Sequence, residues 1–319
     1  MRNILVIYTT GFEFTKDQED KLTADFPQCG FTFRQDTCVD GDSIKNAEVI
    51  VGFPKPELVK KAENLKWLHL SSIGVDKHID KSIYQNEEIL LTNSSGTYGK
   101  PISDHVLGLM IMLARNLHFF RDQQAQHLWN KIDANKDLFH STLCIIGLGD
   151  IGKNLAVKAK ALGMKVIGIK RTAAQLPGYL DELYTTEALD QVLPQADFVV
   201  LSLATTKETV NLMSRERLGL MRKDAYLINI GRGALLDQEA LYDALNTGSL
   251  AGAAIDVTTP EPLPEDSKLW GLKNLIITPH VSGKSPTTCQ RQFSVFYHNL
   301  ERYLSGKELD HVIDFDLMY

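Results

Sequence analysis

Short apolar runs alternate with amphipathic stretches along the chain, and this alternation is typical of parallel sheets covered by helices. In the first hundred residues the apolar runs predict strands at 4–8, 48–51 and 65–70. After residue 140, further runs predict strands at 143–146, 164–169, 198–201, 225–230, 253–256 and 275–278. Residues at helical spacing fill the stretches between them, at 16–26, 56–62, 153–162 and 238–245. The pattern therefore predicts an α/β protein with two sheets.

A polar, glycine-rich segment at 93–99 separates the two predicted sheets and is a candidate hinge. A long helix is predicted after it, at 101–116, with one buried face formed by Ile102, Val106, Leu109, Met110 and Leu113. The polar segment 118–137 is predicted to form an arm outside the core. The last helix, at 287–303, is predicted to return to the first sheet.

The length and composition of the chain fit two globular domains. Of its 319 residues, 44% are hydrophobic and 23% are charged. We place one domain at 1–98 with 286–319, and the other, inserted in it, at 99–285. The net charge of −6 without a long basic run argues against nucleic acid or a membrane surface as partner. With neither an apolar span of roughly 20 residues nor a signal-peptide pattern, we expect a cytoplasmic protein.

The cysteines and histidines show no pattern of a metal site. Cys29, Cys38, Cys144 and Cys289 form no C-x-x-C pair, and no His or Cys group has zinc-ligand spacing. A disulfide framework is not expected in a chain of this size and type. We therefore predict no metal.

A glycine-rich turn joins the predicted strand at 143–146 to the predicted helix at 153–162. It consists of Gly147, Leu148, Gly149, Asp150, Ile151 and Gly152. Glycines let a backbone approach a pyrophosphate closely, and a helix N-terminus offers free N–H groups to the anion. Gly-rich turns are common by themselves, but between a strand and a helix this one predicts dinucleotide binding. We expect Gly147, Gly149, Asp150, Ile151 and Gly152 to contact the cofactor.

The second predicted strand of this unit ends in Lys170, Arg171 and Thr172, where a carboxylate often binds the adenosine ribose 2′-OH. Two cations and a hydroxyl suit a 2′-phosphate better than a free 2′-OH. The pattern favours NADP(H), with NAD(H) still possible. The alternative is a solvated pair of cations at a strand end.

Three ionisable residues follow later predicted strands, where open α/β sheets bind their ligands: Arg232, Glu261 and His280. Each has an ordinary explanation by itself. Arg232 could be a surface ion-pair residue, Glu261 a solvated turn residue and His280 a loop cap. Their joint occurrence downstream of a dinucleotide turn favours a catalytic site.

With these motifs the sequence resembles the NAD(P)-dependent D-2-hydroxyacid dehydrogenases over nearly its whole length. The matching stretches are 65–76, 147–152, 228–237, 251–264, 276–283 and 299–312. Lys170, Arg171 and the arm segment from Gln124 to Trp129 point most to the glyoxylate/hydroxypyruvate reductase branch. The resemblance implies a Rossmann domain, with a doubly wound parallel sheet, and a smaller flavodoxin-like α/β substrate domain.

The resemblance also implies a role for each candidate catalytic residue. Arg232 would hold the substrate carboxylate or polarise the 2-keto oxygen with its donor fork. His280 would give a proton to that oxygen as hydride arrives from the nicotinamide, and would also contact the cofactor. Glu261 would hydrogen-bond the other imidazole nitrogen.

Further contacts are implied for substrate and cofactor. The N–H groups of Ile73 and Gly74 would bind the substrate carboxylate. Asp256 would accept a hydrogen bond from the nicotinamide carboxamide, and Thr206 and the Ile230 backbone would line the cofactor cleft. The resemblance further implies a homodimer formed through the arm, in which Trp129 of one chain reaches the substrate pocket of the other.

Three positions depart from the family pattern: Ala204 stands where proline is frequent, Thr258 where an aromatic is frequent, and Asp104 where glutamate is usual. None belongs to the predicted catalytic trio. An NAD(P)-sensing or corepressor-like binding protein is the alternative reading, because fold alone does not fix function. A formate or phosphite oxidiser is a third reading that no feature of the chain requires. The intact trio favours an enzyme acting on a small 2-keto or 2-hydroxy acid.

Overall fold

The computed structural model describes residues 1–133 and 135–318. Position 134, in the predicted arm, and position 319, at the end of the predicted first domain, lie outside the described residues. The described chain divides into two compact units. Unit 1 comprises residues 1–98 and 284–319, and unit 2 comprises residues 99–283. A search of the described helices finds none long and apolar enough to span a membrane.

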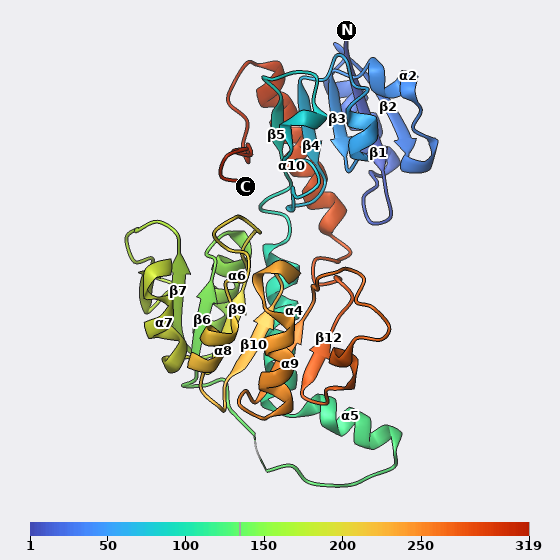
Figure 1. Cartoon of the computed structure of the whole chain (residues 1–319). Helices are drawn as coiled ribbons and strands as arrows, with labels where there is room; N and C mark the ends of the chain where they lie inside the picture. Colours follow the sequence, from blue (N-terminus) through green and yellow to red (C-terminus); the bar gives the residue numbers. More distant parts are fainter. Residues whose placement is uncertain (134, 319) are drawn as a thin grey trace. The chain divides into compact units, whose positions relative to one another are not determined.

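Unit 1 is built on a five-stranded parallel sheet with strand order β2-β1-β3-β4-β5 (Figure 1). Its strands are β1 (Arg2–Tyr8), β2 (Cys29–Gln35), β3 (Val49–Gly52), β4 (Trp67–Leu70) and β5 (Leu90–Thr92). This is the flavodoxin-like order. Strands β1, β3 and β4 match the prediction. The two edge strands were not predicted, because β2 is only half-buried and β5 is three residues long.

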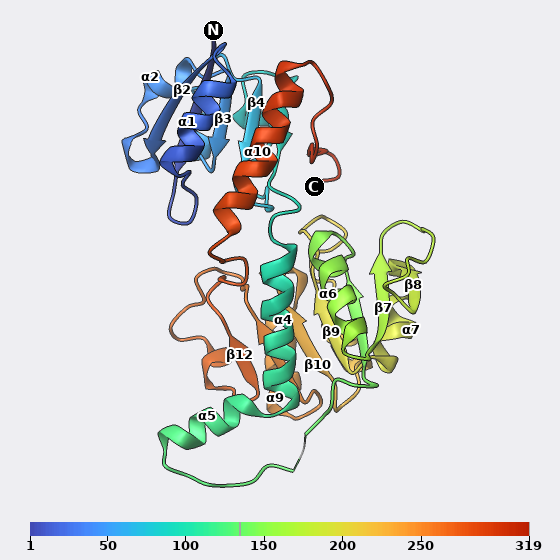
Figure 2. The ribbon, with the colours of Figure 1, turned by 180° about the vertical axis from the view of Figure 1, so that it is seen from behind.

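Helices cover both faces of this sheet. They are α1 (Lys16–Asp25), α2 (Gly41–Lys45), α3 (Pro56–Val59) and α10 (Thr288–Leu304). Alternate side chains of β1 show the two layers, since successive strand residues point to opposite faces. Ile4 and Val6 pack with Phe296 of α10, whereas Leu5 and Ile7 pack with Ile44 of α2. The last helix therefore belongs to the first unit (Figure 2).

Unit 2 contains a seven-stranded parallel sheet in the order β12-β11-β10-β9-β6-β7-β8. Its strands are β6 (Thr142–Ile146), β7 (Lys165–Lys170), β8 (Glu182–Thr185), β9 (Phe198–Leu201), β10 (Tyr226–Asn229), β11 (Gly252–Ile255) and β12 (Leu275–Ile277). This is the doubly wound Rossmann order extended by one strand, which confirms the predicted fold class. Strand β8 was not predicted, because the edge sequence ELYT is polar and half-exposed.

The helices of unit 2 also lie on two faces. They are α4 (Gly99–Ala114), α6 (Asp150–Ala161), α7 (Leu189–Val192), α8 (Arg215–Leu220) and α9 (Gln238–Asn246). Figure 2 shows α4 and α6 over one face, and Figure 1 shows α7, α8 and α9 over the other. The short 3₁₀ helices of the chain are η1 (Asp36–Cys38), η2 (Lys81–Ile83), η3 (Thr186–Ala188), η4 (Leu193–Gln195), η5 (Gly233–Leu235) and η6 (Lys268–Gly271).

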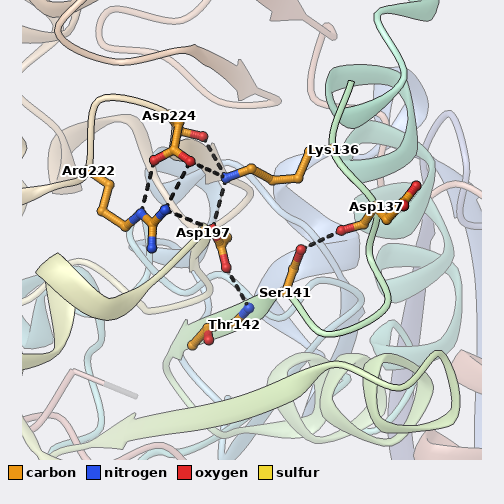
Figure 3. A network of polar contacts seen from close by, with 7 residues as sticks. All are labelled: Lys136, Asp137, Ser141, Thr142, Asp197, Arg222 and Asp224. Atoms are coloured by element: carbon orange, nitrogen blue, oxygen red, sulfur yellow. Dashed lines mark hydrogen bonds and ion pairs between the residues drawn. The ribbon is translucent and has the colours of Figure 1, made fainter. Parts of the chain in front are cut away.

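After α4 the chain forms an arm, which we define as helix α5 (Leu117–Ala125) and residues 126–133. Its return to the sheet is fixed by Lys136, whose ammonium donates to Asp197 Oδ1 at 2.8 Å and Asp224 Oδ2 at 3.1 Å (Figure 3). Asp197 accepts from the N–H of Thr142 at 2.8 Å, and Arg222 pairs with Asp224. These carboxylates precede β9 and β10, so the arm leaves unit 2 at the amino ends of its strands.

Candidate active site

The three predicted catalytic residues follow neighbouring strands of the unit 2 sheet. Arg232 comes after β10, Glu261 after β11 and His280 after β12, and these strands are adjacent in the sheet. Because the strands are parallel, their carboxyl ends meet at one edge. This edge is the ligand-binding side of open α/β sheets.

His280 and Glu261 form a direct pair. The imidazole Nδ1 lies 2.7 Å from Glu261 Oε1. The carboxylate accepts from Nδ1–H, which leaves Nε2 as the nitrogen that exchanges a proton with a ligand. The two side chains are 51% and 42% exposed, so the pair is open to an incoming molecule. The arrangement suits a group that donates a proton when a substrate is reduced and accepts a proton when a substrate is oxidised.

Asp256 holds the loop that carries His280. It is 1% exposed, and Oδ1 accepts from Val281 N at 3.0 Å and from the Thr278 hydroxyl at 2.6 Å. Oδ2 accepts from Ser282 N at 3.1 Å, and the Asp256 carbonyl accepts from His280 N at 2.9 Å. His280 itself has a left-handed φ of 50°. The positioning role of Asp256 was missed by sequence reasoning, although an aspartate directly after a buried strand was a usable signal.

The turn that carries Arg232 is shaped by Asn229, which the sequence analysis did not single out. Asn229 is fully buried, and its side chain donates to the Arg232 carbonyl at 2.9 Å and accepts from Gly231 N at 3.1 Å. The Arg232 guanidinium donates to the Gly231 carbonyl at 2.7 Å. A Cβ at Gly233 would lie 2.1 Å from Thr258 O, so this turn packs tightly against the segment after β11.

The glycine turn between β6 and α6 has the shape expected of an anion cradle. Gly147 has a φ of +105°, and a Cβ there would lie 2.5 Å from Ser202 O. A Cβ on Gly152 would lie 2.0 Å from Gly147 O, whereas no described atom comes within 4 Å of one built on Gly149. Helix α6 begins directly after Gly149, and the first-turn N–H groups have no helical acceptor. The cradle therefore fits a dinucleotide pyrophosphate at Gly149.

Other predicted cofactor contacts lie along the same edge of the sheet. Lys170 ends β7, and Arg171 and Thr172 after it are exposed. Thr206 follows β9, and its N–H donates to Thr209 Oγ1 at 2.7 Å. Ile230 follows β10, and its N–H donates to Leu201 O at 3.2 Å.

Like Asp256, Asp150 is a predicted cofactor contact whose carboxylate is engaged within unit 2. Oδ2 accepts from Gly99 N at 2.7 Å, and Oδ1 accepts from the Asn154 amide at 2.9 Å. Any contact of Asp150 with a pyrophosphate would therefore use its main chain. The following residue, Ile151, lies in the first turn of α6.

In unit 1, Ile73 and Gly74 follow β4. Their carbonyls are fixed, because Asn93 Nδ2 donates to Ile73 O at 2.8 Å and Ser72 Oγ donates to Gly74 O at 2.7 Å. Within the described ranges, the N–H groups of Ile73 and Gly74 make no hydrogen bond. This loop can therefore present two N–H groups to a carboxylate.

Trp129 does not join the other predicted residues within one chain. It lies on the arm, at the amino ends of the unit 2 strands, and is 95% exposed. His280 lies at the carboxyl ends. Across residues 1–133 and 135–318, no group of three or more His, Cys, Asp or Glu side chains is arranged to hold a metal.

Comparison with known proteins gives a family match and a curated relative. A family model described as D-isomer specific 2-hydroxyacid dehydrogenase, NAD binding domain, matches residues 107–282. A protein named glyoxylate reductase from Thermofilum pendens is 32% identical over 258 residues, which cover 79% of this chain and 75% of the relative.

Two solved structures resemble the whole chain. A D-isomer specific 2-hydroxyacid dehydrogenase family protein from Aeromonas salmonicida has a TM-score of 0.87 at 34% identity, with 99% of both chains covered. A D-isomer specific 2-hydroxyacid dehydrogenase from Xanthobacter autotrophicus, in complex with NADPH and MES, has a TM-score of 0.85 at 26% identity, with both chains fully covered.

Proposed function

Because the chain belongs to the D-isomer specific 2-hydroxyacid dehydrogenase family and is an NAD(P)-dependent oxidoreductase, we propose that it reduces glyoxylate or hydroxypyruvate. The observation that carries this proposal is the His280–Glu261 pair at 2.7 Å, placed on the same sheet edge as Arg232 and the glycine turn. The similarity to a protein named glyoxylate reductase supports the choice of a small 2-keto acid.

The proposed reaction uses three side chains of unit 2 and the loop after β4 of unit 1. When bound, a reduced dinucleotide would supply the hydride that adds to C2 of the keto acid. The guanidinium of Arg232 donates hydrogen bonds to the keto oxygen and the carboxylate. These hydrogen bonds stabilise the negative charge that develops on the keto oxygen. His280 gives that oxygen a proton, so the C=O bond becomes CH–OH, and Glu261 accepts from His280 Nδ1–H and fixes the orientation of the ring. The N–H groups of Ile73 and Gly74 bind the carboxylate.

We propose NADPH as the preferred reductant. Lys170, Arg171 and Thr172 end and follow β7, next to the β6 strand that leads into the glycine turn. Cations there neutralise a 2′-phosphate, which NADH lacks. The relative from Xanthobacter autotrophicus was solved with NADPH.

We propose unit 2 as the dinucleotide-binding domain, unit 1 as the substrate domain and a homodimer as the active form. Four large apolar side chains of the arm are exposed to solvent in the single chain: Leu117, Phe120, Leu128 and Trp129. A second copy of the chain would bury them and bring Trp129 to the partner's substrate site. The free thiols of the chain support a reducing compartment such as the cytoplasm.

The test is a spectrophotometric assay of NADPH oxidation with glyoxylate, hydroxypyruvate, pyruvate and bulkier 2-keto acids. We expect turnover to be fastest with the first two. Tight NADPH binding without turnover of any 2-keto acid would contradict the proposal and would indicate a nucleotide-sensing protein instead.

A further inference from the structure

A hollow of about 300 Å³ lies in unit 1 beside the loop that carries Ile73 and Gly74. Its polar lining comes from the turn after β1, the end of β4, the last residue before α4 and the first turns of α10. The residues are Thr9, Thr10, Ser71, Ser72, Tyr98 and Gln292, and the rest of the lining is formed by Gly11, Phe12 and Phe53. All lie in unit 1, so the hollow is a property of this unit alone.

Hydrogen bonds join three lining residues of the hollow: Ser71, Tyr98 and Gln292. Tyr98 OH donates to Ser71 O at 2.6 Å. The Gln292 amide nitrogen donates to the same carbonyl at 2.6 Å and to Tyr98 OH at 2.7 Å, which uses both of its hydrogens. Gln292 is 2% exposed, and within the described residues its Oε1 has no hydrogen-bond partner. These hydrogen bonds hold Ser71, Tyr98 and Gln292 together in the lining and leave Gln292 Oε1 as an acceptor without a partner among the described residues.

The lining carries no charge. None of its side chains is Lys, Arg, His, Asp or Glu. Burial raises the pKa of Tyr98 to about 12, so its hydroxyl stays neutral near pH 7. Arg291 neighbours Gln292, but its guanidinium donates to Thr97 O at 2.7 Å and to the hydroxyls of Thr287 and Thr288 at 2.5 and 3.3 Å.

The hollow adjoins the loop that would hold the substrate carboxylate. Ser72 lines the hollow, and its hydroxyl is bonded to Gly74 O at 2.7 Å. In a three-carbon keto acid only C2 separates the carboxylate from C3. A carboxylate on the N–H groups of Ile73 and Gly74 therefore leaves C3 within reach of the hollow that Ser72 lines.

We propose that this hollow receives the C3 end of the 2-keto acid and selects an uncharged end group over a phosphate or a second carboxylate. The inference rests on the proposed function. A hydroxyl can exchange hydrogen bonds with the hydroxyl lining. A phosphate dianion would exchange part of its hydration for an uncharged lining without gaining a cation, which is unfavourable.

The experiment compares kcat/KM for hydroxypyruvate and for its C3-phosphorylated form, with saturating NADPH. The wild type is expected to prefer hydroxypyruvate by about 10²-fold or more, as expected for an uncompensated charge. Thr10→Arg places a cation at the exposed rim of the hollow and is expected to move the ratio toward the phosphorylated acid by roughly 10–100-fold. Thr9→Lys places a cation at a neighbouring position of the lining and is expected to shift the ratio in the same direction.

Thr37→Arg is the matched control, because Thr37 is exposed in unit 1 but does not line the hollow. It is expected to leave the ratio within about twofold of wild type, the scale of a screened surface charge. Equal use of both acids by the wild type, or an equal shift in Thr10→Arg and Thr37→Arg, would overturn the inference. Failure of the proposed function looks different: glyoxylate, which has no C3, would then not be reduced by the wild type.

Discussion

The imidazole Nδ1 of His280 lies 2.7 Å from Oε1 of Glu261, although 19 residues separate them in the chain. We expect His280→Ala to lower kcat by about 10²–10⁴-fold, the scale of a lost general acid. Glu261→Gln keeps the shape of the side chain but replaces the carboxylate that accepts from His280 Nδ1–H. Its kcat should fall by a smaller factor, about 10–10²-fold.

His298 is the control histidine for this comparison. It is also exposed and near carboxylates, with Nε2 lying 3.3 Å from Asp310 Oδ2, but it belongs to α10 of unit 1. His298→Ala should keep wild-type kcat in the steady-state assay. A His280→Ala enzyme as fast as wild type would remove His280 from the proposed mechanism.

Two glycines of the β6–α6 turn should respond differently to alanine. Gly152→Ala places a Cβ 2.0 Å from Gly147 O, so it should destabilise the fold by about 3 kcal/mol or more. Gly149→Ala meets no described atom within 4 Å and should unfold at the wild-type temperature. Because its methyl group would occupy the pyrophosphate position, NADPH affinity should fall at least about tenfold.

Thermal unfolding and fluorescence titration with NADPH measure the two effects separately. If Gly149→Ala bound NADPH as tightly as the wild type, the pyrophosphate would have to bind elsewhere.

The cations after β7 should control the choice of dinucleotide. The double variant Lys170→Ala/Arg171→Ala should weaken NADPH binding by roughly 10–100-fold and NADH binding by less than about threefold, because only NADPH carries the 2′-phosphate. Lys165→Ala is the control, since Lys165 starts the same strand at its other end and pairs with Glu182 at 2.6 Å. Equal losses for both dinucleotides, measured by titration, would refute the assignment.

The ion pairs of Lys136 with Asp197 and Asp224 should contribute to the stability of the fold in a pH-dependent way. Lys136 is 18% exposed and donates to Asp197 and Asp224, so Lys136→Met should lower the free energy of unfolding by about 1–3 kcal/mol at pH 7. Lys131→Met, on the exposed arm, is the control. Urea unfolding of the variants measures the difference.

The acid dependence follows from Asp224. The Arg222 guanidinium, aided by Lys136, holds the pKa of this carboxyl well below its usual range. A lowered folded pKa stabilises the fold fully above the usual carboxyl pKa, and the contribution is lost as the pH falls toward the folded value. The stability difference between wild type and Asp224→Asn should therefore shrink on acidification below about pH 4. A difference that grew in acid would contradict this account.

The exposed arm should mediate self-association. We expect light scattering to give twice the chain mass of 35.7 kDa. Trp129→Glu places a charge at a side chain that is 95% exposed in one chain and should weaken the dimer. Trp270→Glu is the matched control, because Trp270 is 53% exposed and belongs to η6 rather than to the arm. A wild-type monomer at micromolar concentration would refute the proposed homodimer.

The sequence predicted the elements that consist of continuous apolar residues. It did not predict the strands in which polar residues interrupt the apolar ones. Strand β9 was predicted at its observed bounds, because all four residues are buried and apolar. Strand β8 lies at the edge of the sheet, where β7 is its one neighbouring strand. Its sequence is polar and partly exposed, so the pattern of apolar residues did not predict it. The glycine turn was predictable because a strand, a turn and a helix are consecutive in the chain.

The sequence by itself therefore determined the fold class, and it predicted the glycine turn and the candidate catalytic residues Arg232, Glu261 and His280, since these depend on local patterns and short motifs. Only the tertiary structure decided which buried groups hold them. Asn229 and Asp256 position the loops of the site, and Lys136 reaches partners 61 and 88 residues away. Such contacts depend on which strands are neighbours, and strand order follows from packing of the whole sheet rather than from periodicity along the chain.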